Sequence, residues 1–315
     1  MIDKRSLHFG GVDVPDVGFE AARIVILPLP YERAPSYGTG SQEGPEYLLQ
    51  ASAQLERLDE ETLIDWTTLG LHTRTPPFLS HDPQTAVDQI HTQARKVLET
   101  GKFLLSLGGD HAVSIGLVRA AAEIYENLGV LQIDAHADLR NEWNGSRFNH
   151  ACAMRRVVEM VRGDVVPVGI RSFSPEDYEV MQHCGLHPVY AHEIDPLDDT
   201  WIDRVIDRLP ETVYLTLDLD GLDPSVIPGT GTPEPGGLSY RQAVRLIQRL
   251  GRDRRVVASD ITELAKIEGT QVSELAAAKL ATKMMVNFAG SQVSEDTAVK
   301  PAAKSNGMSQ EYVLI

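Results

Sequence analysis

Short hydrophobic runs alternate with longer amphipathic stretches along most of the chain. Seven runs rich in β-branched residues are hydrophobic at nearly every position, which predicts strands buried on both faces of a parallel sheet. These runs are residues 24–27, 103–107, 130–134, 165–170, 188–191, 213–218 and 255–260. Helical patterns occupy residues 45–55, 83–100, 113–128, 150–162, 175–184, 200–209, 239–251 and 272–288. This alternation predicts a three-layer α/β domain.

The pattern also sets the expected domain boundary. No internal repeat, low-complexity tract or linker divides the chain, so residues 1–288 are expected to form a single domain. The polar residues 289–315 lose the periodicity and are expected to form a C-terminal tail.

The composition argues against two classes of binding partner, nucleic acids and anionic membranes. The chain carries 29 Lys and Arg against 45 Asp and Glu, a formal net charge of −16 with a pI near 5.0. Binding to nucleic acid or to an anionic membrane needs a basic surface, so neither is expected as the main partner. No apolar run approaches the roughly 20 residues that span a bilayer. The acidic excess is compatible with solubility, with a cationic substrate or with metal ions.

Two observations bear on the expected compartment. The N-terminal segment lacks the apolar stretch of a secretory signal. The two cysteines, Cys152 and Cys184, cannot build a disulfide framework or a four-thiolate zinc site. A reducing cytoplasm fits both observations, so a cytoplasmic protein is expected.

Polar residues follow four of the predicted strands, where each strand ends. They form the segments Gly108-Gly109-Asp110-His111, Asp134-Ala-His136-Ala-Asp138, Asp218-Leu-Asp220 and Asp260-Ile-Thr-Glu263. Parallel strands place their carboxyl ends at one edge of the sheet, where ligands bind in open α/β folds. We therefore expect these acids and imidazoles to lie close together.

Their spacing points to a metal centre. In an extended segment, alternate residues point to one face, so Asp134, His136 and Asp138 converge, as do Asp218 and Asp220. Carboxylates gathered without cations would raise one another's pKa, and divalent ions remove that conflict. Carboxylates with imidazoles and no thiolate suit Mn²⁺, with Mg²⁺, Fe²⁺, Co²⁺, Ni²⁺ or Zn²⁺ as alternatives. Several bridging carboxylates suit a pair of ions.

Other chemistries fit the sequence less well. The segment from Gly229 to Glu234 lacks the third glycine of a dinucleotide-binding fingerprint, and the chain has neither a Walker A motif nor a G-x-S-x-G elbow. Cys152 is a conceivable nucleophile, but a cysteine at the start of a helix facing a sheet is more often a small core residue.

At these motifs the sequence resembles the ureohydrolase family of arginases, agmatinases and relatives. Gly108-Gly109-Asp110-His111, Asp134-Ala-His136-Ala-Asp138 and Asp218-Leu-Asp220-Gly-Leu-Asp223-Pro224 match the three metal-binding signatures of that family. The likeness runs in order from about Tyr31 to about Phe288. It implies an α/β/α fold around an eight-stranded, mainly parallel sheet, two Mn²⁺ ions per subunit, and homotrimers or homohexamers.

The resemblance also implies roles for individual residues. His111, Asp134, Asp138 and Asp218 would hold one ion, while Asp134, His136, Asp218 and Asp220 would hold the other. Glu263 matches the carboxylate that receives the substrate guanidinium. His150 matches a histidine implicated in substrate binding or proton transfer, and Asp138 is a candidate proton relay. Asp110 is expected behind the metal ligands, where it either orients a metal-bound imidazole or braces the loop.

The loop from Leu139 to His150 resembles agmatinases more than arginases. Arginases usually have an asparagine at the position of Arg140 and a serine-containing loop that grips the amino-acid headgroup. Without that grip, a cationic guanidino amine that lacks an α-carboxylate is the expected substrate. Agmatine would yield putrescine and urea. Alternatives are guanidinobutyrate, arginine, guanidine, a formimino compound, or a non-catalytic polyamine- or protein-binding role. Around Glu263 the chain departs from the family at Thr262 and Lys266, which puts the shape of that loop in question.

Overall fold

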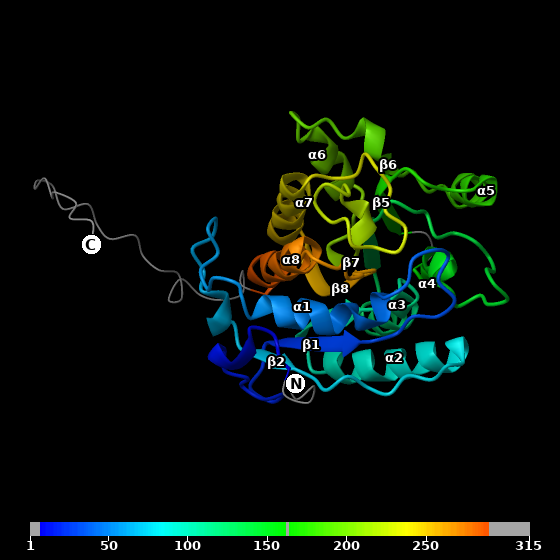
Figure 1. The fold of residues 1–315 in the computed structure, drawn as a ribbon. Coiled ribbons are helices and arrows are strands. Elements are labelled where there is room, and N and C mark those ends of the chain that lie inside the picture. Colours follow the sequence, from blue (N-terminus) through cyan, green and yellow to red (C-terminus); the bar gives the residue numbers. More distant parts are fainter. Residues whose placement is uncertain (1–6, 162–163, 290–315) are drawn as a thin grey trace, which may run out of the picture.

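The computed structural model describes residues 7–161 and 164–289. An eight-stranded, all-parallel sheet forms its centre in the order β2-β1-β3-β8-β7-β4-β5-β6 (Figure 1). The strands are β1 (Ile24–Leu29), β2 (Leu71–Thr73), β3 (Phe103–Gly108), β4 (Leu128–Ile133), β5 (Val165–Ile170), β6 (Val189–Tyr190), β7 (Thr212–Asp218) and β8 (Arg255–Thr262). The predicted tail lies outside the described residues, apart from Ala289.

All seven strands predicted from hydrophobic runs are present. The strand that the pattern missed is β2, a three-residue strand at the edge of the sheet whose sequence, Leu-His-Thr, carries little hydrophobic signal. β4 begins earlier than predicted, because helix α3 ends at Ile124 and Tyr125 is already extended, with φ −112° and ψ 107°. The prediction of a helix to residue 128 was therefore wrong by about one turn.

The eight predicted helices are also present. They are α1 (Gly44–Ser52), α2 (Pro83–Leu98), α3 (Val113–Ile124), α4 (Ala153–Met160), α5 (Pro175–Cys184), α6 (Thr200–Ile206), α7 (Tyr240–Asp253) and α8 (Val272–Phe288). Capping explains several starts: Ser174 and Asp177 form a capping box at α5, and Ser239 and Gln242 form one at α7. The described helices are too short or too polar to cross a bilayer.

Helices cover both faces of the sheet and divide the core in two. One hydrophobic cluster joins the sheet to α1, α6, α7 and α8, and the other joins it to α2, α3, α4 and α5. Strand β1 shows the alternation, since Ile24 and Ile26 belong to the first cluster, and Val25 and Leu27 to the second. Figure 1 shows α1 and α2 on opposite sides of β1. The predicted three-layer α/β/α fold is confirmed.

The strand order explains how distant motifs come together. The four strands that end in acids and histidines, β3, β8, β7 and β4, are consecutive neighbours in the middle of the sheet. Their ends are in register, with Leu107 beside Ile261, Ile261 beside Leu217, and Leu217 beside Ile133. The predicted convergence at one sheet edge is therefore present.

Candidate active site

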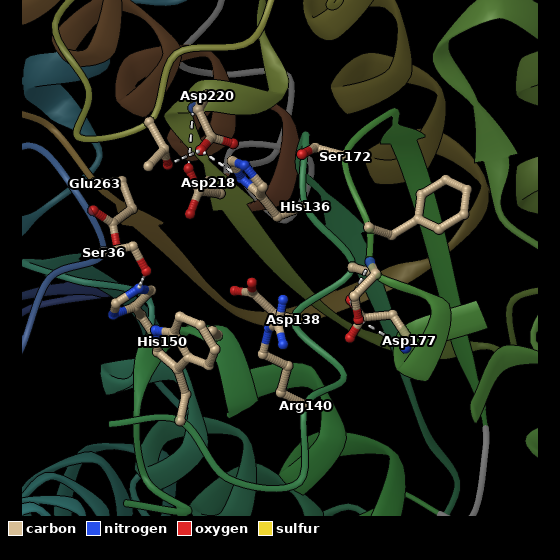
Figure 2. Close-up of a pocket in the computed structure, with 16 residues that line it drawn as sticks. Ser36, His136, Asp138, Arg140, His150, Ser172, Asp177, Asp218, Asp220 and Glu263 are labelled. Atoms are coloured by element: carbon tan, nitrogen blue, oxygen red, sulfur yellow. Dashed lines mark hydrogen bonds and ion pairs between the residues drawn. The ribbon is translucent and has the colours of Figure 1, made fainter. Parts of the chain in front are cut away.

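A pocket of about 310 Å³ opens at the carboxyl ends of these central strands (Figure 2). Its volume is at the lower end of the range of about 300–1,000 Å³ for small-molecule sites. The lining includes the predicted site residues His136, Asp138, His150, Asp218, Asp220 and Glu263. His111 and Asp134 lie behind them, almost fully buried.

One group of possible metal ligands surrounds His111. Its Nδ1 atom lies 2.9 Å from an oxygen of Asp138, 3.2 Å from one of Asp134 and 3.5 Å from one of Asp218. His111, Asp134 and Asp218 each offer one atom to a cluster that spans less than 4.8 Å. The side chains of all four residues therefore lie close to Nδ1 of His111.

A second group shares Asp134 with the first. The Nδ1 atom of His136 lies 2.9 Å from Oδ2 of Asp220 and 3.8 Å from Oδ1 of Asp134. Asp134, His136 and Asp220 also offer ligand atoms within 4.8 Å of one another. Because the two oxygens of Asp134 face different histidines, this carboxylate lies between the two groups.

The side chains of the two groups shift one another's pKa values strongly. Burial and the charge of Asp220 raise the pKa of Asp134 to about 7, and burial with Asp220 and Asp134 raises the pKa of Asp218 well above its usual range. Burial alone would lower the pKa of His136, but Asp220 raises it to about 10. The carboxylates therefore need positive charge nearby, which protonated imidazoles or metal ions can provide.

A hydrogen-bond chain behind His111 sets which of its nitrogens faces the cluster. Its Nε2 lies 3.0 Å from Oγ1 of Thr216, and that hydroxyl donates to Asp260 at 2.7 Å. Asp260 is fully buried and also accepts from Tyr214 and Ser114. Since the Thr216 proton points to Asp260, Thr216 accepts from Nε2–H. Nδ1 is thereby the nitrogen that faces the carboxylates, and its lone pair becomes available to a metal ion when the ring is neutral. Burial alone would lower the pKa of His111, but Asp134 and Asp138 raise it well above its usual range.

These supporting residues were missed by the sequence analysis, although a signal existed. Tyr214, Thr216 and Asp218 alternate along β7 and share one face of the strand, while the residues between them, Leu215 and Leu217, are hydrophobic. Gln132 precedes Asp134 by two positions in β4 in the same way, and its Nε2 donates to Asp134 at 2.9 Å. Polar residues two positions before a predicted ligand mark the supporting layer here.

Two of the predicted site residues adopt left-handed backbone conformations. Asp138 has φ 52° and Glu263 has φ 66°. Such angles are uncommon for residues other than glycine, and they gather at functional sites because surrounding structure must hold them. Glu263 is held by two hydrogen bonds: its N–H donates to the Gly109 carbonyl, and its carboxylate accepts from the His111 N–H, both at 2.8 Å.

The departures near Glu263 leave its position intact. Thr262 is buried in β8 beside Asp218, and the Lys266 ammonium lies over the ring of Tyr47, 5.2 Å from its centre. Burial and the neighbouring Asp110 raise the pKa of Glu263 well above its usual range. The carboxylate still lines the pocket, with one oxygen bonded to the His111 backbone.

Asp110 braces the loop, which was one of its two expected roles. Its carboxylate accepts from the Arg33 N–H at 2.7 Å and from the Ala112 N–H at 3.1 Å. The adjacent Gly109 is required for this packing, because a Cβ there would lie 1.9 Å from the Tyr31 carbonyl oxygen. Asp110 therefore ties the start of α3 to the segment that follows β1.

His150 lies in the pocket wall, at the start of a short 3₁₀ turn (His150–Cys152) that leads into α4. The side chain of Asn149 caps this turn by accepting from the Ala151 N–H. The Nε2 atom of His150 lies 2.8 Å from Oγ of Ser36, a residue that the sequence analysis did not select. Figure 2 shows Ser36 and His150 joined in this way. Burial lowers the pKa of His150, which favours a neutral ring.

The loop after Asp138 forms part of the outer pocket wall. The Arg140 guanidinium lies over the ring of Trp143, 4.3 Å from its centre, and both residues line the pocket. Phe173, which follows β5, lines it as well and remains 43% exposed. The outer wall therefore carries two aromatic rings beside polar and charged groups, whereas the inner end carries the acids and imidazoles.

Comparison with known proteins identifies the family. The model of the arginase family matches residues 22–286. The chain belongs to the arginase family. It is 39% identical to the N(1)-aminopropylagmatine ureohydrolase of Synechocystis sp. over 86% of this chain and 90% of that protein. It is 38% identical to the N(1)-aminopropylagmatine ureohydrolase of Thermus thermophilus, over 87% and 92%.

A solved structure extends the likeness to three dimensions. The agmatine ureohydrolase of Thermoplasma volcanium superposes with a TM-score of 0.80 at 30% identity, covering 87% of this chain and 92% of that one. Both the family and the arginase-like fold predicted from the three motifs are thus confirmed. In this structure the three motifs supply the acids and histidines at the inner end of the pocket.

Proposed function

We propose that this arginase-family protein is a metal-dependent hydrolase that releases urea from the guanidino group of a linear amine. The observation that carries the proposal is the arrangement of two His–carboxylate groups that share Asp134 beneath a pocket lined by Glu263. Nucleophile, electrostatic support and a guanidinium receptor are then available at one end of a single cavity.

The residues present fit a pair of divalent ions. Several carboxylates are buried together with raised pKa values, and both histidines direct Nδ1 at them. We assign one ion to His111, Asp134, Asp138 and Asp218, and the other to Asp134, His136, Asp218 and Asp220. The absence of thiolate donors favours Mn²⁺ among the alternatives. When bound, such a pair supplies hydroxide from water near neutral pH.

Residues of this chain would orient the substrate and move protons. Glu263 is proposed to accept hydrogen bonds from the guanidinium, whose planar N–H fork matches a carboxylate. After hydroxide adds to the guanidino carbon, the bond from that carbon to the amine nitrogen breaks, and this nitrogen needs a proton in order to leave. Asp138 would relay this proton, and His150 would exchange protons with solvent. Asp138 lies 2.9 Å from His111, and both Asp138 and His150 line the pocket.

Two amines are the leading substrates. Agmatine was expected from the loop after Asp138, and the T. volcanium relative is described as an agmatine ureohydrolase. N1-aminopropylagmatine is a second candidate, because the Synechocystis and Thermus relatives, at 39% and 38% identity, carry that name. The exposed ring of Phe173 in the outer wall suits a cationic amine tail, since ammonium groups bind aromatic faces.

A substrate panel tests the proposal. Mn²⁺-loaded protein is assayed for urea from agmatine, N1-aminopropylagmatine, 4-guanidinobutanoate, arginine and guanidine. We expect kcat/KM to be highest for one of the two amines. Preference for 4-guanidinobutanoate, arginine or guanidine would overturn the substrate assignment and leave the reaction class standing. No urea from any compound, with no metal bound after loading, would favour the non-catalytic binding role instead.

Assembly and location are also proposals. We propose a homotrimer or homohexamer in the cytoplasm, on the basis of family membership and cysteine usage. Light scattering coupled to size-exclusion chromatography gives the subunit number directly. A monomer at micromolar concentration would contradict the proposed assembly.

A further inference from the structure

The segment that connects β1 to α1 reaches the pocket. It runs from Pro30 to Gly40, and its Ser36 side chain is exposed at the pocket wall opposite His150. Ser36 Oγ and His150 Nε2 are 2.8 Å apart, although the two residues are separated by 114 positions in the sequence. A contact between such distant segments requires that both be held in place.

The serine-bearing segment is anchored at several points. Near its start, the Arg33 N–H donates to Asp110 at 2.7 Å. Near its end, the Gly40 N–H donates to the carboxylate of Glu32, and the Gly38 N–H donates to the Gly231 carbonyl at 3.1 Å. These bonds fix both sides of the tip that carries Ser36.

The backbone of this segment is also strained. Ala34 has φ 53°, a left-handed conformation that is uncommon for residues other than glycine. Its carbonyl accepts from Nδ2 of Asn149, the residue directly before His150, at 3.4 Å. Two hydrogen bonds therefore join this segment to the turn that carries His150: one between Asn149 and Ala34, and one between His150 and Ser36.

The imidazole of His150 depends on Ser36 for its orientation. Among the described residues, Ser36 is the one hydrogen-bond partner of the ring, because Nδ1 is buried without a partner. A histidine ring otherwise rotates broadly about its last torsion. Loss of the hydroxyl would leave ring orientation to packing alone.

We propose that Ser36 is a positioning residue that fixes the ring orientation of His150 and so belongs to the active site. The inference rests on the proposed guanidino hydrolysis, for which His150 is a proton-transfer group. Ser36 itself acts through His150 and is assigned no contact with the reacting atoms. Its hydroxyl can donate to Nε2 or accept from it, so the contact serves either neutral tautomer.

Three single variants test this inference in the Mn²⁺-loaded protein with the best amine of the substrate panel. Ser36→Ala removes the hydroxyl, and we expect kcat to fall by about tenfold with KM changed by less than about twofold, as for a lost orientation of an acid–base group. Ser36→Thr keeps the hydroxyl and is expected to restore most of kcat. Tyr37→Ala is the matched control, since Tyr37 neighbours Ser36 but is 88% exposed and does not line the pocket.

A double-mutant cycle separates positioning from a structural role. In a His150→Asn background, Ser36→Ala should cause no further loss of kcat, because the group on which it acts is already gone. Unchanged kcat in Ser36→Ala, additive losses in the cycle, or loss of bound Mn²⁺ in Ser36→Ala would overturn the inference. Wild-type protein that releases no urea from any compound would instead overturn the proposed function, so the two failures are distinguishable.

Discussion

Replacing Thr216 by valine tests the hydrogen-bond chain behind His111. Valine keeps the shape of threonine but removes the hydroxyl, which accepts from His111 Nε2 and donates to Asp260. His111 then loses the partner that keeps its lone pair on Nδ1. We expect weaker binding of the ion assigned to His111, with the fold retained.

The expected magnitude follows from the contacts that are lost. Partners behind metal ligands typically contribute about 10–100-fold to metal affinity, which corresponds to about 1.4–2.7 kcal/mol. Asp260 keeps two of its three hydroxyl donors, Tyr214 at 2.7 Å and Ser114 at 2.8 Å, so this buried carboxylate stays hydrogen-bonded. The loss should therefore appear mainly in metal binding.

Calorimetry measures the affinity for Mn²⁺ in a titration of the metal-free protein. Urea release is measured in parallel at each metal concentration. Tyr214→Phe is the control, because it removes a different donor of Asp260 without touching His111. Thr216→Val should require at least tenfold more Mn²⁺ for half-maximal activity, and Tyr214→Phe much less. Equal metal affinity in Thr216→Val and wild type, or an equal loss in Tyr214→Phe, would refute the proposed role of this chain.

The remaining predictions concern a buried cation and the guanidinium receptor. Lys283 is fully buried and lies 2.6 Å from Asp59, so Lys283→Met should destabilise the protein by about 3–5 kcal/mol in urea unfolding. Lys279 forms a partly exposed ion pair with Glu60, so Lys279→Met should lower the free energy of unfolding by less than about 1 kcal/mol. Glu263→Gln should lower urea release at least 100-fold while Mn²⁺ affinity changes little, because its carboxylate is assigned to the substrate; a large loss of metal would contradict that assignment.

The fold was predictable because its strands are buried on both faces. β5 shows this best: every residue from Val165 to Ile170 is buried, so the hydrophobic run and the strand coincide. The edge strand β2 lacks that signal, since His72 and Thr73 are only partly buried. The order of strands could not come from local patterns, because it depends on which non-local pairs form after the chain collapses.

The candidate site residues could be selected from the sequence because their chemistry is concentrated in short motifs. Asp134, His136 and Asp138 lie within five positions, and the end of a single strand brings them together. Ser36 gave no such signal, because one serine in a loop is ordinary and its partner His150 lies 114 positions away. Contacts between loops depend on the assembled fold, so they become visible only in three dimensions.

The raised pKa values of buried site groups imply that the metal-free protein loses stability as pH rises. The pKa of Asp134 is raised from 3.8 to about 7, so ionising it in the folded state costs roughly 4 kcal/mol, at 1.36 kcal/mol per pKa unit. A raised carboxyl pKa lowers stability progressively as pH rises from the unfolded value of about 3.9 to about 7. The raised pKa of His136 adds a further loss, as pH rises from about 6.5 to about 10. The metal-free protein should therefore be less stable at pH 8 than at pH 6.

Metal binding should offset this loss of stability at high pH, because the side-chain ligands bind a metal ion in their deprotonated form and the affinity for Mn²⁺ therefore grows with pH. The rise in Tm on adding Mn²⁺ should be larger at pH 8 than at pH 6, as differential scanning fluorimetry can measure. Asp218→Asn removes one of the crowded charges but keeps an oxygen for the Asp220 N–H, which Asp218 accepts at 3.0 Å. This variant should unfold at a higher temperature than wild type without metal and show a smaller rise with Mn²⁺. A metal-free Asp218→Asn less stable than wild type would show that the acids support the fold rather than oppose it.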